Sequence, residues 1–196
     1  MDLVVQEQIK NMKILIDIDD TISNFGEVLL KYLNQQYDTD YKKDDIINWK
    51  WFRNNFQNPW QPTEYFFFWD EVIIDKDAIN CIENLAKKGH EVYLVTASFP
   101  NDTLGYKIRK VLENFNKNLI NQSNIIICYN KGMIKGNIRI DDGIHNLYND
   151  SINILFDQPW NQNIKGIIPS FERKKSWKEI EIYLENIFKE YNSFIF

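Results

Sequence analysis

The chain has 196 residues, of which 44% are hydrophobic and 26% charged, as expected for one globular domain with a modest insertion. Its net charge of −5 argues against binding to nucleic-acid polymers, which depends on a basic surface, and against docking on an anionic membrane. The sequence has no apolar run near the roughly 18 residues that span a bilayer, no signal peptide in its first ten residues, and no CxxC pair, so we expect a cytoplasmic protein without a zinc site or disulfide framework.

Short runs rich in β-branched residues predict buried strands at 13–18, 91–95, 124–127, 137–140 and 152–156. Because these runs are apolar on both faces, they are typical of strands inside a parallel sheet. Amphipathic patterns separate several of them and predict helices over 77–88, 107–115 and 176–191. The alternation predicts an α/β fold, namely a Rossmann-like parallel sheet with helices on both faces.

Residues 25–74 interrupt this alternation, because they are too many for a simple connection between the first two strands. Ten of the 29 aromatic residues of the chain lie between positions 49 and 69. We expect a small helical cap at 25–74, inserted into a core formed by 1–24 and 75–196. It would cover the carboxyl ends of the strands, where open α/β sheets bind ligands. The aromatic side chains would serve either as the core of this cap or as a platform for a ligand.

Two acidic clusters follow predicted strands. The stretch MKILIDIDDT (residues 12–21) places Asp17 and Asp19 on a common side of its strand, and Asp141 and Asp142 follow a later strand. Parallel neighbouring strands would bring the clusters together, and burying such charges uncompensated would cost several kcal/mol. Oxygen ligands without His or Cys favour Mg²⁺, so these four aspartates are the predicted metal ligands. Asp20 is more readily explained as a solvated turn or a helix cap.

Two further residue types indicate a phosphate site. Thr96 ends a predicted strand, so its hydroxyl and the adjacent Ala97 would lie beside a bound phosphate, and Lys131 would supply positive charge. Taken alone, Thr96 would more often be structural and Lys131 a surface lysine. The two histidines, His90 and His145, have no partner in the sequence that indicates a catalytic role.

The order Asp-x-Asp-x-Thr, then Thr, then Lys, then Asp-Asp resembles the four motifs of the haloacid dehalogenase-like superfamily of phosphotransferases, and the resemblance spans residues 13–142. It implies that Asp17 attacks phosphorus and forms an aspartyl-phosphate. It also implies that Asp19 protonates the leaving oxygen and then activates water. Dehalogenases lack this second acid, so its presence favours phosphatase chemistry.

Several local strings are similar to the 5′(3′)-deoxyribonucleotidase family, especially its bacterial and phage members. They are FDQPWN at 156–161, SWKEI at 176–180 and EYFFFWDE at 64–71. The resemblance implies that Phe25 packs beside the substrate base and that cap aromatics receive base and sugar. The substrate contacts we expect are Phe25, Trp60 and Phe67.

The predicted function is therefore Mg²⁺-dependent hydrolysis of (deoxy)nucleoside monophosphates. Base stacking on aromatic side chains, worth about 1–3 kcal/mol, suits such a substrate. One alternative is a phosphatase for another small phosphate ester. A second is a non-catalytic nucleotide-binding module, and the intact set of acidic residues argues against it. The sequence leaves the oligomeric state open, with a homodimer as one possibility.

Overall fold

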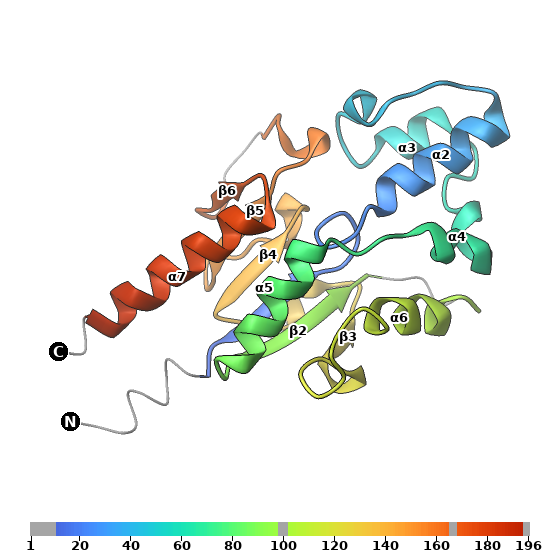
Figure 1. Cartoon of the computed structure of the whole chain (residues 1–196). Coiled ribbons are helices and arrows are strands. Elements are labelled where there is room, and N and C mark those ends of the chain that lie inside the picture. Colours follow the sequence, from blue (N-terminus) through green and yellow to red (C-terminus); the bar gives the residue numbers. More distant parts are fainter. Residues whose placement is uncertain (1–10, 98–101, 165–167, 194–196) are drawn as a thin grey trace.

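A computed structural model describes residues 11–97, 102–164 and 168–193. Its centre is a parallel sheet in which the described strands are ordered β3-β2-β1-β4-β5-β6 (Figure 1). The strands are β1 (Lys13–Asp17), β2 (Glu91–Thr96), β3 (Ile125–Ile127), β4 (Ile138–Asp141), β5 (Ile152–Phe156) and β6 (Glu172–Lys174). The α/β class expected from the sequence is confirmed.

Strand β1 lies inside the sheet, between β2 and β4, and its apolar side chains are buried on both faces. Ile16 pairs with Leu94 of β2 on one side and with Ile140 of β4 on the other, and all three are fully buried. The chain runs outward from β1 in both directions, so β1 and β4 flank a topological switch point. Open α/β sheets bind ligands in the crevice at the carboxyl ends of such strands.

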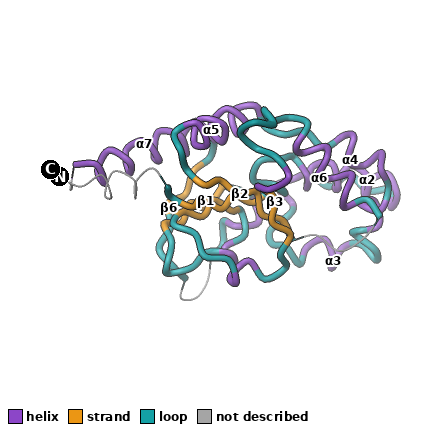
Figure 2. The backbone as a smooth tube through the Cα atoms, turned by 90° about the horizontal axis from the view of Figure 1, so that it is seen from below, coloured by secondary structure: helices purple, strands orange, loops and turns teal. Residues whose placement is uncertain are grey.

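Helices α5 (Lys76–Lys87) and α7 (Trp177–Ser193) pack together on one face of the sheet (Figure 2). Asp75 caps α5, since its side chain accepts hydrogen bonds from the backbone N–H groups of the first turn. Helix α6 (Leu104–Leu112) links β2 to β3 and begins three residues before the predicted helix. No helix in the described ranges is long and apolar enough to cross a membrane.

Residues 25–74, called here the aromatic insert, contain α2 (Phe25–Tyr37), α3 (Trp51–Asn55) and α4 (Phe66–Glu71). In Figure 1 these helices lie beyond the carboxyl ends of the strands. They enclose a second hydrophobic cluster, separate from the core that the sheet forms with α5 and α7. The insert leaves and rejoins the rest of the chain at one point, where Ser23 and Ile74 form an antiparallel bridge. Its role as a cap stays a prediction.

Candidate active site

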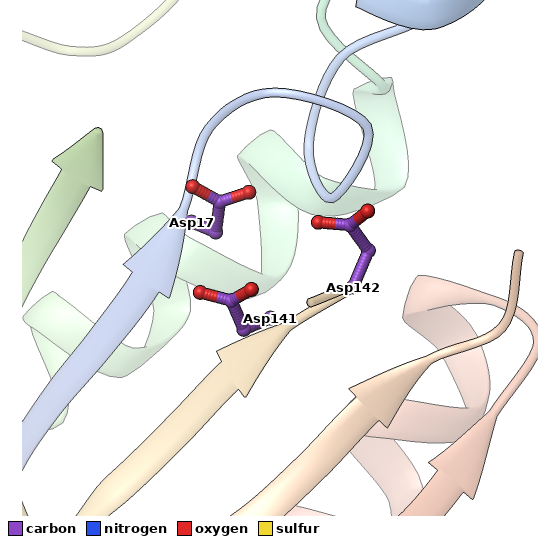
Figure 3. Close-up of side chains that lie close together, drawn as sticks. All are labelled: Asp17, Asp141 and Asp142. Carbon is purple, nitrogen blue, oxygen red and sulfur yellow. The ribbon is translucent and has the colours of Figure 1, made fainter. Parts of the chain in front are cut away.

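Three carboxylates converge at the switch point of the sheet. Asp17 ends β1, Asp141 ends the neighbouring strand β4, and Asp142 follows directly (Figure 3). One oxygen of each lies within 4.8 Å of the others, and all three residues are buried. The parallel pairing of β1 with β4 produces this arrangement, because it places both strand ends at the same edge.

Lys131 lies between two of these carboxylates. Its Nζ is 2.5 Å from Oδ1 of Asp17 and 2.7 Å from Oδ2 of Asp141. Burial alone would lower the pKa of Lys131, but the two negative charges outweigh burial and raise the pKa. Lys131 therefore stays charged and offsets one of the three carboxylates.

Simultaneous ionisation of the clustered carboxylates is unfavourable, because burial and mutual repulsion raise the pKa values of Asp17 and Asp142. Burial raises the pKa of Asp17 to about 7; Lys131 opposes the rise, and the charges of Asp141 and Asp19 add to it. Burial also raises the pKa of Asp142, with the charges of Asp17 and Asp141 adding to the shift. A cation placed among these groups would favour their ionised forms.

The hydrogen bonds around the cluster indicate which oxygens could hold a metal. Both oxygens of Asp141 are taken, since Oδ2 faces Lys131 and Oδ1 accepts from Gly143 N at 2.8 Å and Asn146 Nδ2 at 2.9 Å. By contrast, in the part of the chain that the structure describes, Oδ2 of Asp17 and Oδ1 of Asp142 have only long bonds, 3.3 and 3.5 Å, from the Thr21 hydroxyl. Three carboxylates against one lysine suit a hard divalent cation.

The carboxylate of Asp19 is not part of this cluster and is held on the other side of the site. Its Oδ2 accepts a hydrogen bond from Lys107 Nζ at 2.5 Å and from Thr96 Oγ1 at 3.2 Å. Lys107 also donates to the Thr96 hydroxyl at 3.0 Å. Oδ1 of Asp19 is buried and has no hydrogen-bond partner among the described residues. The prediction that Asp19 binds metal stays a prediction.

A cavity of about 360 Å³ opens above these groups. Its floor carries Asp17, Asp19 and Asp142 together with the ammonium groups of Lys107 and Lys131. Aromatic rings form much of its walls. The lining also includes Arg53, Thr63, Tyr129, Gly143, His145 and Asn146. The wall aromatics from the insert are Phe25, Trp49, Trp60 and Trp69, and Ala97 also lines the cavity.

The aromatic residues expected to contact substrate lie in different places. Trp60 lines the cavity and is half-buried. Phe25 also lines it, but its ring is buried against Trp69, with centroids 5.8 Å apart. Phe67 is not among the lining residues; it is 52% exposed and stacks on Tyr65 at 5.2 Å. Its assignment as a substrate contact gains no support from this position.

Two residues of the site were not anticipated from the sequence. Lys107 is only 2% exposed although it is a lysine. It lies on the apolar face of α6, one turn before the buried Val111. A cation on the apolar face of an amphipathic helix was the available signal. Asn146 gave no such signal, because its contact with Asp141 depends on the turn after β4. His145, given no catalytic role above, lines the cavity, and burial lowers its pKa.

Asp20 is buried rather than solvated, and it bonds to the first turn of α2, whose N-cap residue is Asn24. Its Oδ1 accepts a hydrogen bond from Gly26 N at 2.7 Å, in the first turn of α2. Burial raises the pKa of Asp20 to about 8, and the hydrogen bond from Gly26 opposes the rise. Asp20 therefore acts on the insert rather than on the cavity.

Comparisons of the whole chain with known proteins agree with this site. The family model described as "5′ nucleotidase, deoxy (Pyrimidine), cytosolic type C protein" matches residues 11–188. A 5′(3′)-deoxyribonucleotidase of Bacillus subtilis (strain 168) and one of Bacillus phage SPbeta are each 35% identical over 172 residues, which cover 86% of this chain and 95% of each relative. A 5′(3′)-deoxyribonucleotidase of Clostridium acetobutylicum is 27% identical over 182 residues, covering 88% of this chain and 94% of that protein.

Solved structures share the fold at lower identity. The magnesium-bound putative HAD-hydrolase YfnB of Bacillus subtilis has a TM-score of 0.55 at 14% identity, covering 89% of this chain and 98% of its own. A HAD hydrolase of Entamoeba histolytica has a TM-score of 0.56 at 14% identity, covering 91% of this chain and 99% of its own. At these identities the likeness concerns the fold alone.

Proposed function

The chain belongs to the 5′(3′)-deoxyribonucleotidase family of haloacid dehalogenase-like phosphatases, and we propose that it hydrolyses deoxynucleoside monophosphates with the help of Mg²⁺. One observation carries the proposal. A single cavity joins a floor of carboxylates and lysines to walls made of aromatic rings. The floor suits a phosphate with a divalent cation, and the walls suit a flat, weakly polar group such as a base.

In the proposed reaction, a carboxylate oxygen of Asp17 attacks phosphorus while the ester bond to the nucleoside oxygen breaks. Asp19 gives its proton to that leaving oxygen, which departs as the nucleoside hydroxyl. Asp19 then takes a proton from water, whose oxygen attacks the phosphorus of the aspartyl-phosphate while the bond between phosphorus and the Asp17 oxygen breaks. Inorganic phosphate leaves, and both carboxyl groups return to their starting states.

The lysines and the threonine would hold the phosphate during this exchange. Lys131 contacts Asp17 and lines the cavity, so its charge lies where phosphate oxygens would carry negative charge. Thr96 ends β2 at the same edge of the sheet, and Ala97, which follows it, lines the cavity. Lys107 orients Asp19 through their buried ion pair.

The residues present fit a magnesium ion. Asp17 and Asp142 would hold it, since each has a carboxylate oxygen with only a long hydrogen bond. Asp141 would affect the ion indirectly, because Lys131, Gly143 and Asn146 already donate hydrogen bonds to both of its carboxylate oxygens. When bound, the ion supplies positive charge to the phosphate and to the nucleophile. Cytoplasmic location and homodimer formation stay predictions.

A phosphate-release assay tests this function. The purified chain is offered a panel of deoxy- and ribonucleoside 5′- and 3′-monophosphates and of sugar phosphates, with Mg²⁺ or with EDTA. We expect Mg²⁺-dependent release that is fastest from a deoxynucleoside monophosphate. Preference for a sugar phosphate over every nucleotide would contradict the substrate class, and full activity in EDTA would contradict the metal site.

A further inference from the structure

The indole of Trp160 is bonded directly to a carboxylate of the acidic cluster. Trp160 belongs to η6 (Pro159–Asn161), the short 3-10 helix that follows β5. Its Nε1 donates a hydrogen bond of 2.6 Å to Oδ2 of Asp142. Trp160 is 6% exposed and Asp142 is 2% exposed, so water does not compete for this bond.

The same turn fixes the backbone around Asp142. The Asn161 side chain donates to the carbonyl oxygen of Asp142 at 2.9 Å, and Arg173 holds Asn161 by donating to its backbone oxygen at 2.8 Å. Gln158 donates to the carbonyl oxygen of Asp20 at 2.6 Å, in the loop after β1. One segment therefore contacts both acid-bearing loops.

The indole ring also contacts the aromatic insert. It is a member of the second hydrophobic cluster, and its centroid lies 5.2 Å from that of Trp49, which lines the cavity. The rotation of the indole is consequently constrained on one side by the insert and on the other by the carboxylate. A ring held in this way fixes the direction in which its N–H points.

We propose that Trp160 is a positioning residue that sets the affinity of the cluster for a divalent cation. By holding Oδ2 of Asp142, the indole leaves Oδ1, which has a 3.5 Å contact with Thr21, as the oxygen that would bind the cation. Hydrogen bonds to a ligating carboxylate typically change metal affinity by 10–100-fold. The proposal rests on the proposed function only in that Asp142 binds a divalent cation.

The test compares Trp160→Phe with Trp177→Phe. Trp177 is also buried, and its Nε1 donates to the carbonyl oxygen of Thr21 at 2.9 Å, so the control loses an indole bond to the same region without touching a carboxylate. Mg²⁺ binding to each metal-free protein is measured by titration calorimetry, without substrate. We expect the dissociation constant to rise about tenfold or more in Trp160→Phe and to stay within twofold in Trp177→Phe.

Phosphate release separates positioning from simple loss of structure. Raising Mg²⁺ to saturation should restore most of the kcat of Trp160→Phe, because only the affinity for the cation has changed. If Trp160→Phe does not fold, Trp160→β-(3-benzothienyl)alanine keeps the ring shape, replaces the N–H by sulfur, and should show the same loss of affinity. Wild-type affinity in either folded variant, or an equal loss in Trp177→Phe, would overturn the proposal. Failure of the wild type to bind Mg²⁺ would overturn it too, whereas binding without nucleotide hydrolysis would contradict only the proposed function.

Discussion

The Nζ atom of Lys107 lies 2.5 Å from Oδ2 of Asp19, and the lysine side chain is almost completely buried. The pair joins α6 to the loop after β1, two segments far apart in the sequence. Removing one partner of a buried ion pair leaves an uncompensated charge, which is strongly destabilising. Lys107 therefore keeps the proposed acid–base residue in one position, and its own charge faces the cavity.

Replacing Lys107 tests this arrangement. We expect Lys107→Met to lower kcat for a nucleotide by about 10²-fold, the lower end of what a general acid–base residue contributes. Lys110→Met is the control, because Lys110 lies on the same helix but pairs with Asp70 near the surface, 3.3 Å away. Steady-state kinetics with equal losses in both variants would show that Lys107 acts only through helix stability.

The proposed nucleophile is tested by Asp17→Asn. An amide cannot form the aspartyl-phosphate, so we expect no measurable turnover while the far-ultraviolet circular dichroism spectrum stays that of the wild type. Asp19→Asn should lose 10²–10⁴-fold in kcat, because leaving-group protonation and water activation are both removed. Substantial turnover by a clean Asp17→Asn preparation would place the nucleophile elsewhere.

The two adjacent aspartates after β4 should behave differently when neutralised. Asp142→Asn removes a buried charge that has no cationic partner among the described residues. The metal-free protein should therefore become more stable and lose the rise in Tm on adding Mg²⁺. Asp141→Asn instead weakens the ion pair with Lys131 and should lower Tm in EDTA. Thermal denaturation of both variants, with and without Mg²⁺, checks the difference. Equal shifts would mean that the two carboxylates share one role.

Stability at alkaline pH should depend on Asp20. Its pKa of about 8 lies above the value of 3.8 for an exposed carboxyl, so the folded state binds the proton more tightly than the unfolded state does. Its neutral form stabilises the fold at low pH, and that stability is lost as pH rises from about 4 to about 8. Asp20→Asn stays neutral and keeps the acceptor for Gly26 N.

The expected result follows from this loss of stability with rising pH. The Tm of Asp20→Asn should exceed that of the wild type by several degrees at pH 8.5 and by much less at pH 5, since about 1 kcal/mol corresponds to roughly 2–4 °C in a chain of this size. Differential scanning calorimetry in EDTA over this range provides the measurement. Parallel curves for the two proteins would show that Asp20 is ionised throughout.

Substrate discrimination should depend on the cavity aromatics and not on the exposed ones. Trp60→Leu removes a cavity wall, so kcat/KM for a deoxynucleoside monophosphate should fall by about tenfold, the order expected for one stacking partner. Activity on p-nitrophenyl phosphate should hardly change, because this ester needs only the phosphate site. Phe67→Leu is the control and should leave both activities unchanged. A loss confined to Phe67→Leu would reverse these assignments.

The core of the fold was predictable because its strands carry a strong local signal. The buried run that includes Ile14 and Ile16 can only be an interior strand, and the aspartate that ends it marks the edge of the sheet. Strand β6 was missed, because its three residues, Glu172–Lys174, are all charged and only pair at the margin of the sheet. A short edge strand forms because it pairs with the neighbouring strand, and its own composition does not predict it.

Residues of the site could be predicted where a sequence motif lies at the end of a strand. They were missed where tertiary packing alone brings a residue to the site. Asp17, Asp141 and Asp142 follow directly from strand ends that must meet. Lys107 of α6 meets Asp19 in the loop after β1 through tertiary packing, which no local sequence pattern encodes. The insert shows the same limit, since Phe67 and Trp60 are equally aromatic in sequence but only Trp60 lines the cavity.

The proposed function depends most directly on one cavity that binds both the phosphate and the base. Inorganic phosphate release is therefore measured from a deoxynucleoside 5′-monophosphate, its 3′ isomer and a sugar phosphate, using wild type and Asp17→Asn with Mg²⁺ or EDTA. We predict rapid release from at least one deoxynucleoside monophosphate by the wild type with Mg²⁺, and none by Asp17→Asn or in EDTA. Release from the sugar phosphate alone, or equal release by Asp17→Asn, would contradict it.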